Sequence, residues 1–159
     1  MEIKYLLHYE KNKQNLKKAE VKQPEPCTLE EIEFLEKELN NHFALPASFK
    51  EYLSIGGKYS ALPLDVIYDS MKNTTDYVKY KLHSRGIYFD RPIVVFDHLD
   101  NLCFTFIYLD EGNAPKPFNC SLDPNYDSDE GKIVWETPHE TFSKMIEKYV
   151  ALGIAGMGA

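Results

Sequence analysis

The clearest hydrophobic periodicity in the chain lies near its C-terminus. The apolar residues there recur at positions i, i+3, i+4, i+7 and i+8, on one face of a helix; they are Phe142, Met145, Ile146, Tyr149 and Val150. The preceding residues Thr137-Pro138-His139-Glu140 have the pattern of a capping box with proline at the first helical position. We therefore expect a C-terminal helix that begins there and packs on a sheet.

A second helical pattern lies in the N-terminal third of the chain. Thr28 and Glu31 form a capping box immediately before a helix that we expect from about residue 29 to 40. Acidic residues cover most of this helix, and its single apolar face consists of Ile32, Leu35 and Leu39.

Two further helices are expected after it. The first should open at Leu45-Pro46, with proline at the tolerated first-turn position, and end at Gly56-Gly57. Its apolar stripe consists of Phe49, Tyr52 and Leu53. The second should cover residues 66–82, where the apolar spacing is less regular, and Gly86 should end it.

Strand patterns occupy the second half of the chain. Two runs of β-branched and aromatic residues, 93–96 and 102–109, flank a five-residue hairpin loop, and residues 132–135 are typical of another strand. We expect the segment 112–125, which contains proline and asparagine, to be a connection. The whole pattern predicts an α+β fold with a central antiparallel or mixed sheet, packed by N-terminal helices and a C-terminal helix.

The length of 159 residues fits a single domain. We expect this domain to cover residues 1–150, with its core in about 28–150, and residues 151–159 to be a flexible glycine-containing tail. Residues 1–22 suit either a short strand or a short helix, followed by a solvated basic turn.

Composition favours a soluble, cytoplasmic protein. No apolar run is long enough to span a bilayer, and an apolar N-terminus soon gives way to charged residues, so export and membrane insertion are not expected. Cys27, Cys103 and Cys120 show no CxxC or metal-ligand spacing, and Cys103 suits a strand in the core. We expect no disulfide framework, no metal and no cofactor.

The net charge of −7 is concentrated in one stretch of the sequence. Residues 97–130 hold eight acids against Lys116 alone, whereas the rest of the chain has 17 acids and 17 bases. The eight acids are Asp97, Asp100, Asp110, Glu111, Asp123, Asp127, Asp129 and Glu130. Such a segment repels nucleic acid and attracts basic partners, although it also suits a merely solubilising surface.

The order of these patterns resembles the SUKH superfamily of bacterial toxin-immunity proteins, which also includes a fungal cell-wall-synthesis regulator. The similarity covers about residues 28–150 and is most specific in the acidic helix 29–39, Leu45-Pro46, the aromatic segment 49–53 and Gly56-Gly57. Two positions depart from the family pattern. Asn40 replaces a glycine, although asparagine can still form a left-handed C-cap, and Ile55 replaces an asparagine.

This resemblance implies a non-catalytic immunity protein of a polymorphic or contact-dependent toxin system, comparable to the antitoxin of a toxin–antitoxin pair. Bacterial members of the family neutralise toxins, commonly nucleases or nucleic-acid deaminases, by direct binding. We therefore expect a cognate protein toxin domain with a basic surface as the partner. We expect no direct contact with nucleic acid or membrane, and a monomer or weak homodimer.

The expected partner surface consists of Asp97, Asp100, Asp110, Glu111, Asp123, Tyr126, Asp127, Asp129 and Glu130. Its carboxylates would stand in for phosphates, and aromatics such as Tyr108 or Tyr126 would slow release, so that the toxin cannot reach its substrate. The only tryptophan, Trp135, suits either this interface or the core.

The sequence also permits a metal site, an enzyme site or a scaffold function. Asp123–Asp127 resembles the start of a calcium loop, but Ser128 and Val134 replace its essential glycine and glutamate. Asp97, His98 and Asp100 suit a hairpin turn, or else the metal or acid–base site of an enzyme. A scaffold or regulator of an endogenous partner would use the same surface chemistry.

Overall fold

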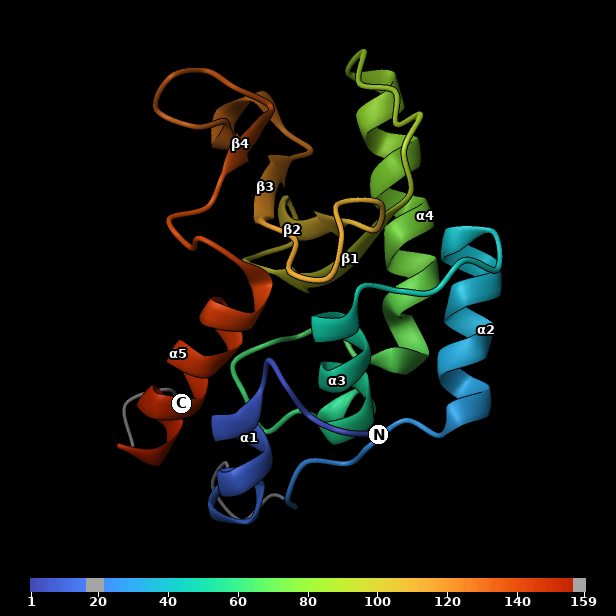
Figure 1. Ribbon diagram of the computed structural model, residues 1–159. Helices are drawn as coiled ribbons and strands as arrows, with labels where there is room; N and C mark the ends of the chain where they lie inside the picture. The colour runs from blue at the N-terminus through green and yellow to red at the C-terminus, as the bar shows by residue number, and fades with distance from the viewer. Residues whose placement is uncertain (17–21, 156–159) are drawn as a thin grey trace.

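The computed structural model describes residues 1–16 and 22–155, and it shows an α+β fold (Figure 1). The helices are α1 (Leu7–Asn12), α2 (Leu29–Asn40), α3 (Ala47–Gly56), α4 (Tyr68–Ser84) and α5 (Phe142–Ile154). The strands are β1 (Ile93–His98), β2 (Cys103–Tyr108), β3 (Pro117–Ser121) and β4 (Val134–Glu136). Short 3₁₀ turns cover Lys13–Asn15 and Pro124–Tyr126.

The strands form one antiparallel sheet in the order β1-β2-β3-β4. Alternate residues of each strand face opposite sides, so the sheet carries an apolar cluster on each face. One cluster joins the sheet to α1, α2, α3 and α5, and the other joins it to the C-terminal half of α4. The predicted α+β class, with helices flanking an antiparallel sheet, is confirmed.

Helix α2 begins and ends for local reasons. The capping box is present as predicted, because Thr28 Oγ1 accepts from the Glu31 amide and the Glu31 carboxylate accepts from the Thr28 amide. The left-handed C-cap was predicted at the wrong residue: Asn41 adopts it, with φ of 52°. Asn40 stays helical, and its buried side-chain amide donates to the carbonyls of Phe43 and Ala44.

Helices α3 and α4 are close to their predicted positions. Helix α3 begins at Ala47, so Pro46 is its N-cap residue and not the first helical residue. Helix α4 runs two residues beyond the predicted 82, and Gly86, with φ of +86°, follows its C-cap Arg85.

The predicted start of the C-terminal helix is wrong. Helix α5 begins at Phe142, where Thr141 Oγ1 accepts from the Lys144 amide. Thr137 does not cap the helix, because its hydroxyl donates to the Pro117 carbonyl on β3. Helix α5 continues to Ile154, so the predicted tail begins within the helix, and residues 156–159 of that tail lie outside the described residues.

Strand β3 corrects the prediction that residues 112–125 are only a connection. Its five residues pair with β2 from Cys103↔Ser121 to Ile107↔Pro117. Pro117 and Asn119 disguise the strand in the sequence, since both residues are depleted in strands. Pro117 is tolerated because it is the first residue of β3.

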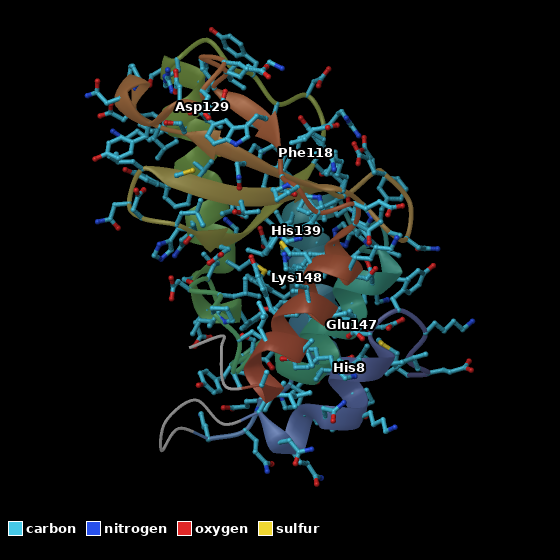
Figure 2. The ribbon with its side chains drawn as sticks, turned by 90° about the vertical axis from the view of Figure 1, so that its left-hand side faces the viewer. His8, Phe118, Asp129, His139, Glu147 and Lys148 are labelled. Carbon is cyan, nitrogen blue, oxygen red and sulfur yellow. The ribbon has the colours of Figure 1, made fainter. Side chains whose placement is uncertain are left out.

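The N-terminal segment is anchored by two acidic side chains. The buried Glu51 carboxylate accepts from the amides of Lys4, Tyr5 and Leu6. Glu147 on α5 accepts from the amides of His8 and Tyr9, and Figure 2 shows His8 and Glu147 side by side. Of the two predicted alternatives, a helix forms here, whereas residues 17–21 of the predicted basic turn lie outside the described residues.

Candidate functional site

The structure divides the nine predicted partner-binding residues among three segments: the β1–β2 hairpin, the end of β2, and the loop between β3 and β4. The register of β2 and β3 puts Cys103 beside Ser121 and Ile107 beside Pro117. Asp110 and Glu111 therefore follow one end of β2, whereas the β1–β2 turn and the loop 122–133 lie at the other end. The nine residues do not form one continuous surface.

Asp97 is buried and belongs to β1, not to the hairpin turn. An irregularity in the β1–β2 register between Val95 and Asp97 places Asp97 opposite Thr105. Its carboxylate accepts from the Asp65 amide at 2.9 Å, and it is 5% exposed. Burial raises the pKa of Asp97 to about 6, although the hydrogen bond to Asp65 opposes this shift. This acid is therefore not available at the surface.

Asp100 has the structural role that a turn predicts. Its carboxylate accepts from the amides of Leu102 and Cys103 at 2.7 and 2.8 Å, which closes the β1–β2 turn. His98 is the last residue of β1, and its ring Nδ1 is buried without a hydrogen-bond partner among the described residues.

Asp110 and Glu111 share one neighbouring cation, Arg91. Arg91 contacts both oxygens of Asp110 and reaches Glu111 at 3.1 Å. Its guanidinium carbon lies 3.9 Å from the centre of the Tyr108 ring. The hydrogen bonds from Arg91 lower the pKa of Asp110. Arg91 offsets only one of these two negative charges, and Tyr108 already contacts an intramolecular partner.

The remaining five predicted residues lie in the loop between β3 and β4. Asp123 caps the 3₁₀ turn 124–126 by accepting from the Asn125 amide, and Tyr126 is exposed. Asp127 forms a two-point ion pair with Arg85, which also donates to the Ser121 carbonyl. Arg85 therefore connects the middle of the β3–β4 loop to the C-terminal end of α4.

After Asp127, the β3–β4 loop and β4 line an open surface concavity of about 630 Å³. Its walls carry four carboxylates, one ammonium group and one indole, and its lining residues are Asp127, Ser128, Asp129, Glu130, Lys132, Trp135 and Glu136. Figure 2 shows Asp129 at the opposite end of the molecule from His8 and Glu147. We call this surface the acidic hollow.

Two carboxylates of the acidic hollow are free to bind a partner. Asp129 and Glu136 are exposed, and within the described part of the chain they make no hydrogen bond or ion pair through their side chains. Glu130 pairs with Lys132 at 2.8 Å, but both side chains are more than half exposed, so water screens this pair. The hollow can therefore attract a cation without first breaking a buried contact.

The hollow lies along the edge of the sheet. Val134 packs in the apolar cluster beneath α4, so Trp135 and Glu136 project to opposite faces of β4. Both nevertheless line the hollow, which places it against the strand edge between the two faces. Trp135 is half-buried and presents its remaining ring surface there.

Glu136 was missed in the sequence because it lies outside the acidic stretch 97–130. The signal that would have found it is its position directly after Trp135, at the end of the predicted strand 132–135; its pairing with Phe118 is visible only in the structure. A second surface was also missed. Exposed Tyr80 and Tyr88 line a smaller hollow of about 240 Å³ at the end of α4, together with His83.

The metal ligands suggested by the sequence do not come together in the described residues. No three His, Cys, Asp or Glu side chains come together there in a way that would hold a metal ion. Asp123 and Asp127, which the calcium pattern would use, are instead bonded to a backbone amide and to Arg85. Burial raises the pKa of Cys103 to about 11, as expected for a strand residue in the core.

Comparison of the chain with protein-family models, curated proteins and solved structures finds no match. No helix within residues 1–16 and 22–155 is long and apolar enough to cross a bilayer. The geometry and charge of the acidic hollow are therefore the main evidence for what it binds.

Proposed function

We propose that this protein is a non-catalytic immunity protein that binds a cognate toxin through the acidic hollow and blocks the toxin's substrate-binding surface. The observation that carries the proposal is the convergence of Asp129, Glu130 and Glu136 beside Trp135 in one open concavity. Toxins that act on nucleic acid need a basic surface for their substrate, and this hollow has the complementary charge.

The mechanism is competition for the same basic surface. Carboxylates of the hollow occupy the Lys and Arg side chains that otherwise contact phosphates, which speeds encounter and fixes the orientation of the complex. The indole of Trp135 supplies apolar contact area of the kind that dominates binding energy in protein interfaces. The toxin is inhibited because its substrate cannot enter, and no bond is made or broken.

The resemblance to the SUKH pattern supports the same function. The parts that carry it are the capped acidic helix α2, the aromatic helix α3 and the Gly56-Gly57 end. These parts determine the fold, and they support the function only through the family that shares this pattern. Gly57 lies where a Cβ would come within 2.4 Å of the Cys27 sulfur, so these glycines serve close packing.

A growth-rescue assay tests the proposal. The toxin domain encoded beside the gene is expressed in a sensitive bacterium together with the wild-type protein or a variant, and co-purification is measured in parallel. The hollow variant carries Asp129→Asn, Glu130→Gln and Glu136→Gln. The matched control carries Glu30→Gln, Glu33→Gln and Glu38→Gln on the exposed face of α2, which changes the net charge equally.

We expect rescue and co-purification with the wild-type protein and with the α2 control, and loss of both with the hollow variant. Continued killing in the presence of soluble wild-type protein would contradict immunity against this toxin. Full rescue by the hollow variant would show that the toxin is bound elsewhere on the protein.

A further inference from the structure

The outer edge of β4 carries backbone groups that the sheet does not use. The Thr137 amide donates to the Pro117 carbonyl, and the Ser121 amide donates to the Ile133 carbonyl. Hydrogen-bonded pairs alternate along an antiparallel ladder, so the intervening pair Trp135↔Asn119 is also directed into the sheet. The amides and carbonyls of Val134 and Glu136 therefore point away from β3.

These outward groups have no partner in the described ranges of the chain. The sheet order ends at β4, and no backbone or side-chain hydrogen bond there joins Val134 or Glu136 to another element. The β1 edge is different, because the Val95 amide donates to Thr75 Oγ1 on α4 at 3.0 Å. Figure 1 shows α4 beside β1.

A free strand edge is a template for pairing with another strand. Pairing with a second copy of this chain is disfavoured, because the carboxylates of two acidic hollows would be brought together. With a basic extended segment, the electrostatic interaction at this edge becomes attractive. The segment would bring Lys or Arg side chains to Asp129 and Glu136, whose charges are free.

We propose that β4 binds an extended, Lys- or Arg-containing segment of the partner as a fifth strand, paired through the backbone groups of Val134 and Glu136. The proposal rests on the function above and specifies how the toxin is held. A residue directly opposite Glu136 projects to the same face, so a basic side chain there meets its carboxylate. The neighbouring residues of the segment project to the face of Trp135, where a guanidinium or ammonium group can lie on the indole.

The chain contains one tryptophan, so the fluorescence of Trp135 reports binding at this edge directly. The probe is a nine-residue peptide of alternating lysine and threonine, acetylated and amidated at its ends. Two control peptides carry N-methyl groups on every lysine or on every threonine amide. Each set of methyl groups blocks one edge of the extended peptide and leaves its charge unchanged.

We expect the unmodified peptide to shift the Trp135 emission and one methylated peptide to bind nearly as well. The other methylated peptide should lose at least about tenfold in affinity, because its blocked edge must face β4. Equal binding of all three peptides would overturn strand addition, while leaving the acidic hollow as a site of charge attraction. Binding by none of them would overturn strand addition as well, and the growth-rescue assay would then decide the proposed function separately.

A protein variant gives an independent readout. Val134→Pro removes an outward amide and no bond of the sheet, so the fold should be retained, as checked by circular dichroism and thermal unfolding. It should reduce affinity for the unmodified peptide at least about tenfold, with the acidic side chains still present. Unchanged affinity in a folded Val134→Pro protein would overturn the proposal. If that variant does not fold, the methylated peptides decide the question.

Discussion

The two edges of the sheet differ in what their outward backbone groups meet. At the β1 edge, Val95 is fully buried and its amide donates to Thr75 on α4. At the β4 edge, Val134 is only partly buried, and its amide points away from β3 without a partner in the described residues. The same chemical group therefore completes the core at one edge and is free for a partner at the other, and the difference is the presence of a covering helix.

The acidic residues show the same contrast. Asp97 on β1 is held between the sheet and its covering helices, where burial raises its pKa. Asp129 beside β4 is exposed, and its side chain makes no hydrogen bond or ion pair with a described residue. Net charge in the sequence counts both residues equally, but only the exposed one can contribute to partner recognition.

Proline substitutions at the outward amides should give the largest difference between the edges. Val95→Pro should destabilise the protein by more than about 3 kcal/mol, because it removes a buried hydrogen bond and disturbs a fully packed position. Val134→Pro should cost only about 1 kcal/mol, since its amide has no bond to lose and only its partly buried side chain changes its packing. Urea unfolding of both variants measures this. Equal losses of stability would show that the outward amide of β4 matters to the fold as much as that of β1.

The pH dependence of stability should reveal the buried Asp97. Its pKa of about 6 in the folded protein lies above its ordinary 3.8, so the folded state favours the protonated form. The resulting stabilisation is complete below about pH 4 and is lost as the pH rises through about 6. The nearby ionisable groups are Asp65 and His98, and Tyr52 and Tyr149 lie on the helices packed against this face.

The expected loss between pH 4 and pH 7 is about 2 kcal/mol relative to Asp97→Asn, which cannot ionise. Urea unfolding of both proteins across this range measures the difference, in which the pH dependence of groups distant from Asp97 cancels. Parallel stability curves for the two proteins would mean that Asp97 is solvated.

Thr75→Val tests the hydrogen bond between α4 and the β1 edge without changing the size of the side chain. The variant leaves the buried Val95 amide without an acceptor, so we expect a loss of about 2 kcal/mol in unfolding free energy. Thr74→Val is the matched control, because the neighbouring Thr74 is only partly buried and the change in helix propensity is the same. If both variants lost the same stability, the Thr75 hydrogen bond would not be the cause.

The smallest effect on stability is expected at the open edge. The hollow variant, with Asp129→Asn, Glu130→Gln and Glu136→Gln, should shift the midpoint of thermal unfolding by less than about 2 °C. Its exposed carboxylates have no buried partner in the described structure to lose. A larger loss would assign these acids to the fold and remove their freedom to bind.

The sequence predicted the elements that are specified locally. The capping box of Thr28 and Glu31 and the apolar stripe of Phe142 to Val150 depend on neighbours a few residues away, and both are present. Strand β3 was missed because it depends on pairing with β2, which overrides the low strand preference of Pro117 and Asn119. The start of α5 was misplaced for a similar reason, since Thr137 is taken by the sheet.

The acidic hollow was predictable in part. The loop residues Asp127, Asp129 and Glu130 line it as part of the acidic stretch, and Trp135 was named as an interface candidate. Charge counting could not separate them from Asp97, which is buried, because burial there depends on the β1–β2 register. It also could not find the cation Arg91 beside Asp110, since their contact depends on tertiary structure.

Association kinetics with the purified toxin domain test the central claim most directly, namely that the acidic hollow at the open β4 edge attracts a basic partner. The rate constant is measured for the wild-type protein, the hollow variant and the α2 control, Glu30→Gln with Glu33→Gln and Glu38→Gln, from about 50 to about 500 mM salt. We predict that the hollow variant associates roughly tenfold more slowly at low salt and loses most of its salt dependence, whereas the α2 control stays within about twofold of wild type. Equal rates and salt dependence for the hollow variant and the control would contradict the account.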